Sequence, residues 1–201
     1  MARPARPEHE IEHLRQHILD AASRVFASHG FEAASIEEIA REAGYGASTL
    51  YGYFKGKQAI VSAIMERFFE DQESVFEMVL PAGLSLRQSL ELLVRRQLEL
   101  LEPRRAGLVF LSQRGVPEVE GFEAYRDRET ALHAHFSAWV EAHARPGDLG
   151  KYSAEMATRR LNGLILSELF HWVRDDSGIP LADRVPEILD FFFHGVGSSN
   201  A

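Results

Sequence analysis

The stretch that decides the fold is residues 35–57, which read SIEEIAREAGYGASTLYGYFKGK. Ser35 is followed three residues later by Glu38, a capping box that predicts the start of a helix. Gly44 predicts where this helix ends, because a tight turn needs a positive φ that costs glycine little. A second short helix is expected over 47–54. Two short helices joined by a glycine turn indicate a helix-turn-helix, whose second helix enters the major groove of DNA.

The second helix of this pair has an apolar side and a small, polar side. Leu50 and Phe54 are four residues apart, so they share one face and hold the helix on the core. The other side allows close approach to DNA, and its hydroxyl groups can bond bases or phosphates. These outward positions are Ala47, Ser48, Thr49, Tyr51, Gly52 and Tyr53. The plainer interpretation is an ordinary three-helix core with two surface tyrosines, and the pattern alone leaves both readings open.

The composition is that of a globular protein without thiol chemistry. The 201 residues are 45% hydrophobic and contain no cysteine, which excludes disulfides and cysteine catalysis and fits a reducing cytoplasm. No apolar run approaches the ~20 residues that span a bilayer, and the charged N-terminus lacks a signal-peptide core. Of the net charge of −8, residues 1–57 carry only −1, so the acidity does not oppose DNA contact there. The sequence predicts a cytoplasmic protein without membrane contact.

Helical periodicity, interrupted by glycine and proline, predicts an all-α chain of about nine helices. The first helix is expected to end at Gly30. Residues 1–57 should form an N-terminal three-helix DNA-binding domain with an extended arm, and 58–201 a C-terminal helical bundle. The helices are expected at about 10–29, 35–43, 47–54, 58–80, 85–101, 103–111, 118–143, 153–175 and 181–194.

Many positions at fixed spacing together resemble the TetR family of transcriptional regulators. The matching residues are Phe26, Gly30-Phe31, Ser35-Ile36-Glu37-Glu38-Ile39-Ala40, Ala43-Gly44, Thr49-Leu50-Tyr51, Tyr53-Phe54 and Lys57. The resemblance covers roughly residues 10–65 and implies a DNA-binding repressor. No phosphate loop, nucleophile elbow or protease zinc motif appears, so we expect neither an enzyme nor a cofactor. It implies groove contacts from Ala47, Ser48, Thr49, Tyr51 and Gly52, and phosphate contacts from Ser35, Tyr53 and Lys57. Gly46 and Ser48 depart from the family, which often has serine and glycine there, so the operator sequence is left open.

The resemblance also implies a homodimer that reads a pseudo-palindromic operator and is released by a small, largely apolar ligand. The last two helices are expected to form the dimer interface, through Leu161, Leu164, Ile165, Leu169, Val185, Ile188, Leu189 and Phe192. The ligand is expected inside the C-terminal bundle, lined by Phe68, Phe76, Phe110, Gln113, Phe136, Trp139, Met156, Arg160, His171 and Trp172. These stripes could instead pack within one chain, as aromatic residues at helical spacing commonly do.

Histidines supply the main alternative class, a helical-bundle metalloenzyme. His9, His13 and His17 recur every four residues, and Glu10/His13 and Glu168/His171 are Glu-x-x-His pairs. Such a site needs two further glutamates that converge from other helices, so solvated histidines are favoured and no metal is expected. Another alternative keeps the fold and the DNA binding but places the protein under the control of a protein partner.

Overall fold

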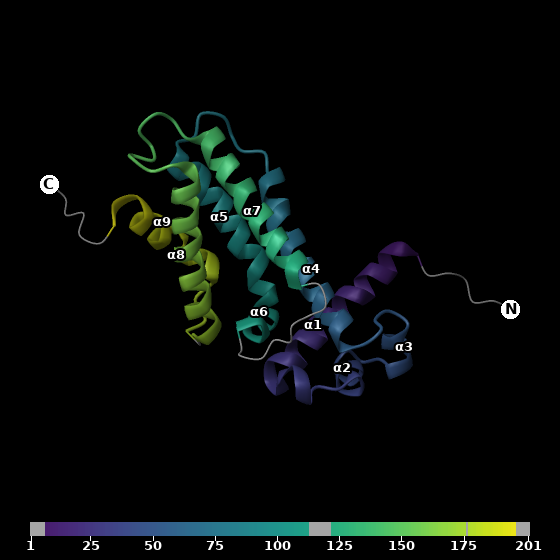
Figure 1. Ribbon diagram of the computed structural model, residues 1–201. Coiled ribbons are helices and arrows are strands. Elements are labelled where there is room, and N and C mark those ends of the chain that lie inside the picture. Colours follow the sequence, from purple (N-terminus) through teal and green to yellow (C-terminus); the bar gives the residue numbers. More distant parts are fainter. Residues whose placement is uncertain (1–6, 113–121, 176, 196–201) are drawn as a thin grey trace. The chain divides into compact units, whose positions relative to one another are not determined.

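The computed structural model describes residues 7–112, 122–175 and 177–195, which contain nine α-helices and no β-strand (Figure 1). The predicted all-α fold class is therefore confirmed for the described residues. The helices are α1 (Glu8–Ala33), α2 (Ile36–Glu42), α3 (Ala47–Tyr51), α4 (Lys57–Ser74), α5 (Leu86–Leu101), α6 (Arg105–Ser112), α7 (Phe122–His143), α8 (Ala154–Arg174) and α9 (Val185–His194). Short 3-10 turns lie at Val75–Glu77, Glu102–Arg104 and Leu181–Arg184.

The chain forms two compact units that interleave in sequence. The first unit is Met1–Arg67 with Arg104–Phe122, and the second is Phe68–Pro103 with Glu123–Ala201. Helix α6 thus packs with the N-terminal helices, which differs from the division at residue 57. The physical reason lies in the core, where the rings of Phe110 on α6 and Phe26 on α1 pack with their centroids 5.0 Å apart.

The first unit is built on α1, whose apolar stripe is fully buried. Ile18 and Phe26 have no exposed surface. The helix kinks at Gly30, where φ is 76°, and Phe31 folds back so that its ring lies 5.6 Å from Phe26. Helix α6 packs directly on α1, because a Cβ at Gly107 would already be in van der Waals contact with the Ser23 hydroxyl, at 3.4 Å. The glycine stop predicted for the first helix is thus a kink within α1.

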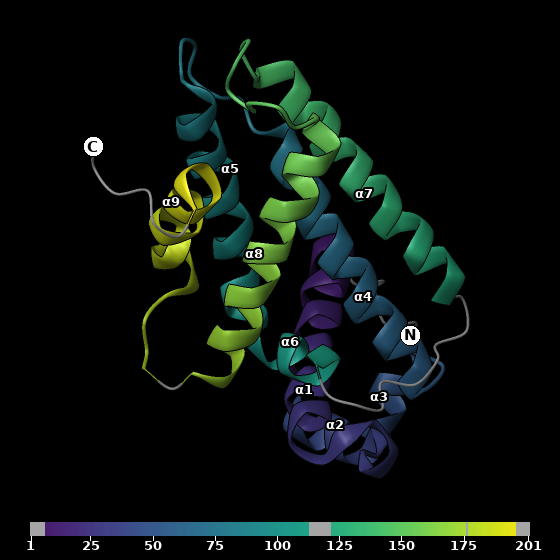
Figure 2. The same ribbon diagram turned by 60° about the vertical axis from the view of Figure 1, so that its left-hand side comes forward.

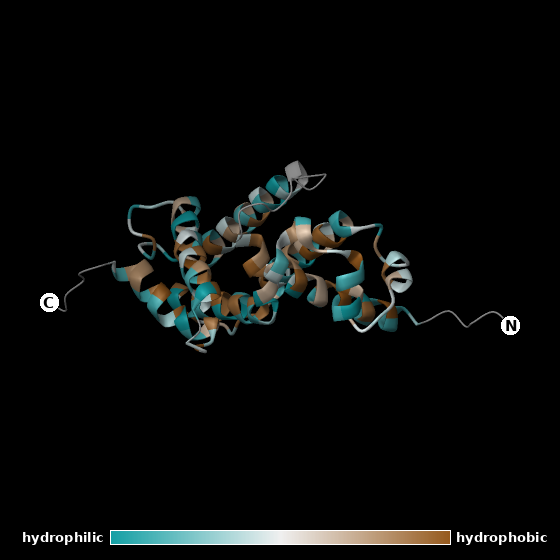
Figure 3. Cartoon of the chain, turned by 90° about the horizontal axis from the view of Figure 1, so that it is seen from below, coloured by the Kyte–Doolittle hydropathy of each residue, from teal (hydrophilic) through white to brown (hydrophobic). Residues whose placement is uncertain are grey.

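The second unit is a bundle of long helices, in which Figure 2 shows α5, α8 and α9 side by side. Ser85 caps α5 through a capping box with Gln88. Hydrophobic and hydrophilic residues alternate around the helices (Figure 3), as expected for helices that bury one face. Helix α4 ends at Ser74 rather than at Leu80 as expected. Pro81 disfavours helical backbone at the residue before it, and Met78 is already extended with ψ of 126°.

Two predicted absences can be examined in the described part of the chain. None of its helices is long and apolar enough to cross a membrane. Its histidine and acidic side chains form no group of three or more that could hold a metal ion. Instead, His17 Nε2 lies 3.2 Å from the Ala43 carbonyl oxygen, and Glu168 pairs with Arg184 at 3.1 Å. The metalloenzyme alternative therefore has no site among these residues.

Candidate nucleic-acid interface

Helix α2 is held at both ends by local hydrogen bonds. At its start, Ser35 Oγ accepts from the Glu38 amide at 3.2 Å, and the Glu38 carboxylate accepts from the Ser35 amide at 2.9 Å. At its end, Gly44 has φ of 73° and donates to the Arg41 carbonyl, while Tyr45 donates to the Ala40 carbonyl at 2.8 Å. This pair of bonds is a Schellman motif, which fixes the direction in which the chain enters α3.

Helix α3 is short and anchored by two buried side chains. Leu50 is 1% exposed and Phe54 is 4% exposed, so both hold the helix on the core as predicted from their spacing. The regular helix spans Ala47–Tyr51 rather than continuing to Phe54. The turn continues beyond it, because the amides of Tyr53 and Phe54 both donate to the Leu50 carbonyl at 2.9 Å. The predicted groove-facing positions therefore all lie on α3 or on its C-cap residue Gly52.

The side of α3 opposite these anchors is open to solvent. Ser48, Tyr51 and Gly52 are exposed, and the Tyr51 ring is 57% exposed. Ala47, Thr49 and Tyr53 are half-buried. An exposed tyrosine beside small residues leaves both hydroxyl and methyl groups on one surface, the mixture that contacts base edges and phosphates. The geometry thus brings together the six positions expected on this side.

Two residues expected at phosphates are already hydrogen-bonded within the unit. The Ser35 hydroxyl donates to Glu38 Oε2 at 3.0 Å. Lys57 Nζ donates to the carbonyls of Phe31 and Ala34 at 2.7 Å each and to that of Glu32 at 3.1 Å. All three ammonium donors of Lys57 thereby have acceptors, and the ammonium also lies 4.7 Å from the centre of the Phe31 ring. A phosphate contact from Lys57 would have to displace one of these carbonyls.

Two neighbours that the sequence pattern did not single out are better exposed. Lys55 follows α3, is exposed, and has no ion pair among the described residues. Tyr45 is 41% exposed in the turn before α3 and meets the His17 ring edge-on at 6.1 Å. Lys55 lies between α3 and α4, a position from which a lysine can reach a phosphate. The sequence alone shows this position, so Lys55 could have been predicted as a phosphate ligand.

Electrostatics reinforce the start of α2. The Ser35 backbone amide, followed by the Ser35 hydroxyl, holds the pKa of the Glu38 carboxyl below its usual value. The carboxylate is thus charged at neutral pH at the N-terminus of a helix, where negative charge is favourable. Arg24 and Glu42 add an exposed ion pair of 2.7 Å between α1 and α2.

Comparison with known proteins agrees with this geometry. The family model described as bacterial regulatory proteins, tetR family, matches residues 18–64, which include α2, the glycine turn and α3. Residues 18–64 are thus a DNA-binding domain of the TetR family of transcriptional regulators. As in that family, the N-terminal helix-turn-helix is the DNA-binding element of the chain.

Relatives that match most of the chain are named as helix-turn-helix transcriptional regulators. The chain is 23% identical to the transcriptional repressor KstR2 of Rhodococcus jostii, over 92% of this chain and 91% of the relative. It is 24% identical to the transcriptional activator FasR of Mycolicibacterium smegmatis, over 90% of this chain and 82% of the relative. The regulator FadR of Bacillus subtilis, solved in complex with stearoyl-CoA, superposes with a TM-score of 0.67 at 18% identity, covering 90% of this chain and 98% of FadR. The last similarity supports the TetR fold.

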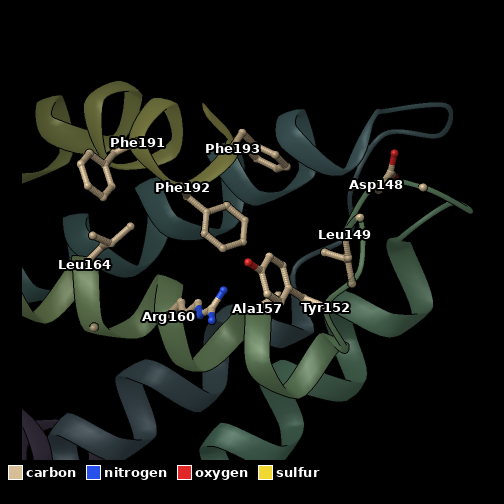
Figure 4. A pocket seen from close by; sticks show the side chains of 12 residues that line it. Asp148, Leu149, Tyr152, Ala157, Arg160, Leu164, Phe191, Phe192 and Phe193 are labelled. Carbon is tan, nitrogen blue, oxygen red and sulfur yellow. The ribbon is translucent and has the colours of Figure 1, made fainter. Parts of the chain in front are cut away.

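Two hollows stand out among the described residues of the second unit. The larger, of about 670 Å³, lies between the loop after α7, the first half of α8 and the end of α9. Figure 4 shows Phe192 above Tyr152 and Arg160, and the Arg160 guanidinium lies 4.2 Å from the centre of the Tyr152 ring. A hydrogen bond from Arg160 is the main reason why the pKa of Tyr152 is lowered. The smaller hollow, of about 330 Å³, lies among α5, α7 and α8 beside Phe76 and Phe136.

The residues expected to line a ligand pocket do not gather in one place. Phe76 and Phe136 line the smaller hollow, and Arg160 lines the larger. The expectation for Phe110 is wrong, because this side chain is 1% exposed in the core of the first unit. Gln113 lies outside the described residues. The others line neither hollow: Phe68 packs on Phe69, Trp139 stacks on His143, Met156 and His171 are exposed, and Trp172 donates to the Ile179 carbonyl.

Most residues expected at the dimer interface are buried within one chain. These six side chains are at most 5% exposed: Leu161, Ile165, Leu169, Val185, Ile188 and Leu189. They pack α8 and α9 into the bundle, so they cannot offer apolar surface to a second chain. Leu164 and Phe192 are half-buried and line the larger hollow. The exposed apolar side chains of the two helices are Leu166, Phe170 and Phe191, together with Met156.

Proposed function

We propose that this TetR-family regulator is a homodimeric repressor that binds a pseudo-palindromic operator and is released by a small molecule. The observation that carries the DNA-binding part is the two-sided build of α3. Leu50 and Phe54 fix it to the core, while Ser48, Thr49 and Tyr51 stay on its open side. A helix held in this way can enter a major groove without rearrangement of the unit.

Dimerisation is supported by apolar surface that the single chain leaves uncovered. Leu166 and Phe170 are four residues apart on α8 and are 38% and 44% exposed, and Phe191 on α9 is 47% exposed. Leu166 and Phe170 therefore share one face of α8. A twofold axis at this surface would present two copies of α3 to two half-sites, which accounts for a palindromic operator.

The repressor and its release are the finer part of the proposal. KstR2 is named a repressor and FasR an activator, and both cover most of this chain, so similarity alone does not choose between them. We adopt repression because a dimer bound across an operator blocks access to that DNA without any further contact. A ligand that binds the second unit releases the operator only if its affinity differs between the two states.

Selection of bound sequences from random double-stranded DNA tests this function. Wild-type protein should enrich a motif with two related half-sites. Thr49→Ala/Tyr51→Ala should bind the enriched motif weakly, while Tyr152→Ala, an exposed tyrosine of the second unit, should bind it like wild type. Equal and salt-sensitive binding of the wild type to every sequence would refute the proposal.

A further inference from the structure

The larger hollow of the second unit has a polar centre between apolar walls. The centre is formed by Arg160 on α8 and Tyr152 in the loop before α8, and both side chains line the hollow and are exposed. Figure 4 shows the Tyr152 hydroxyl turned toward the Arg160 guanidinium, with the Phe192 ring above both. Both polar groups are therefore open to a molecule that enters the hollow.

The hydrogen bond within this pair leaves donors for a third group. A guanidinium has five N–H donors, and the bond that Arg160 gives to Tyr152 uses one of them. Because the Tyr152 oxygen accepts this bond, its own O–H is left to donate. Neither side chain has a further hydrogen bond within the described part of the chain. The centre thus presents donors from two side chains to the same space.

The charge at this centre is positive. Lys151 Nζ lies 5.5 Å from the centre of the Tyr152 ring, and neither Lys151 nor Arg160 has an ion pair with another described residue. The acidic residue of the lining is Asp148, whose carboxylate accepts from the Arg145 backbone amide at 2.9 Å. Figure 4 shows Asp148 at the far end of the hollow, with its carboxylate turned away from Arg160. Two cations without a carboxylate partner favour an anion between them.

The walls around this centre can hold a hydrocarbon body. The hollow has a volume of about 670 Å³, which falls within the range of about 300–1,000 Å³ that is usual for small-molecule sites. One end borders the proposed dimer surface, because Phe191 belongs to both. The large apolar side chains of the lining are Leu149, Leu164, Phe191, Phe192 and Phe193.

We propose that the larger hollow binds a small organic anion, a carboxylate on an aromatic or other apolar body. The Arg160 guanidinium can hold a carboxylate through two parallel N–H···O bonds, and the Tyr152 O–H can donate to the same group. The body then packs on Phe192 and Leu164. An apolar side chain of a second copy would instead cover the Arg160 charge without a counter-ion, which is costly. The largely apolar ligand expected from the sequence thereby gains an anionic head.

Two probes of the same shape and different charge test this selectivity: para-ethylbenzoate and para-ethylbenzamide. Each is titrated into the full-length protein near neutral pH, with saturation-transfer NMR as the readout of binding. We expect the benzoate to bind at least roughly tenfold more tightly, because only a carboxylate makes charge-assisted bonds to Arg160. Equal binding of the two probes, or no saturable binding of the benzoate up to its solubility limit, would overturn the proposal.

Three variants with exposed side chains identify the groups that bind the anion. Arg160→Met should abolish the preference for para-ethylbenzoate. Arg159→Met is the matched control and should keep it, because Arg159 pairs with Glu155 and lines the smaller hollow instead. Tyr152→Phe keeps the ring on which the guanidinium lies and should weaken benzoate binding about fivefold through loss of one donor. All three should unfold at the wild-type temperature, and an Arg160→Met variant that retains the preference would refute the role of Arg160.

A dimer-surface variant tests whether a second copy fills the hollow instead. Leu166→Glu/Phe170→Glu removes the apolar side chains of α8 that lie outside the hollow. Binding of para-ethylbenzoate by this variant alone would show that the partner covers the hollow in the wild type, and the proposal would fail. Wild-type binding that is no weaker than that of the variant supports the anion site.

Operator binding separates this inference from the proposed function, on which the role of the anion as an effector rests. If para-ethylbenzoate binds with the expected selectivity and operator affinity does not change, the site stands and release by a ligand at this site fails. If the operator is bound specifically but the benzoate shows no preference over the benzamide, the DNA-binding function stands and the anion site fails.

Discussion

Replacing Lys57 by methionine distinguishes a structural role of this residue from a role in DNA contact. The change removes an ammonium that donates to three carbonyl oxygens at the end of α1, at 2.7, 3.1 and 2.7 Å. Methionine keeps most of the apolar stem, so the loss is chiefly that of the charged head. Lys55→Met is the matched control. It removes the same charge two residues earlier in the chain, from a side chain that is exposed.

The magnitude follows from the contacts. A hydrogen bond to a charged group contributes about 1.5–3 kcal/mol, and a cation–π contact at a partly exposed site adds about 0.5–1 kcal/mol. The bond to Glu32 is exposed and contributes little, while the bonds to Phe31 and Ala34 are partly buried. Water reaches the freed carbonyls and recovers part of the loss. We therefore expect Lys57→Met to lower the free energy of unfolding by about 2–3 kcal/mol, roughly 5–10 °C in Tm.

Two measurements decide the matter. Circular dichroism at increasing temperature should show the lower Tm for Lys57→Met and no change for Lys55→Met. The salt dependence of operator binding should be nearly unchanged for Lys57→Met, whereas Lys55→Met should reduce the slope by about 2 per dimer, one for each lost phosphate contact. Wild-type stability of Lys57→Met together with a reduced salt slope would refute the structural role and restore the phosphate contact implied by the family resemblance.

Three further predictions concern α2, the glycine turn and the dimer. Because the pKa of Glu38 is lowered in the folded state, its contribution to stability is present above the usual carboxyl pKa and is lost as pH falls through the lowered value. The Tm difference between wild type and Glu38→Gln should therefore vanish in acid. A difference that persists in acid would contradict a contribution from the charged Glu38 carboxylate. Gly44→Ala should lower the free energy of unfolding in urea by about 1 kcal/mol, because φ at this position is 73°. Gly46→Ser should raise it by about 0.3 kcal/mol, because φ of −80° suits serine and its hydroxyl can cap α3. Leu166→Glu/Phe170→Glu should sediment as a monomer and Leu92→Glu, an equally exposed leucine on α5, as a dimer; a dimeric double variant would place the interface elsewhere.

The parts of this fold that could be predicted from the sequence are those set by neighbours along the chain. Both capping boxes, at Ser35 and Ser85, were open to prediction because their partners stand three residues away. Gly44 was predicted at the turn because only a positive φ completes the Schellman bonds. The burial of Leu50 with Phe54 followed from helical spacing alone. Each of these features depends on a few consecutive residues, and together they were enough to identify the DNA-binding element.

Features that depend on residues far apart in the chain could not be predicted in this way. Lys57 was expected to face outward, because nothing near it in sequence shows that the end of α1 offers three carbonyls. Phe110 was placed in the ligand site because an aromatic residue on an apolar helix looks the same whichever unit the helix joins.

The contacts beside the smaller hollow could not be predicted from the sequence either, because they join residues far apart in the chain. Gln72 and Gln97 each stand on a helix where a single polar residue is unremarkable, and only the packing of α4 against α5 brings their amides to 2.6 Å. The family resemblance implied a largely apolar ligand and gave no sign of this polar pair.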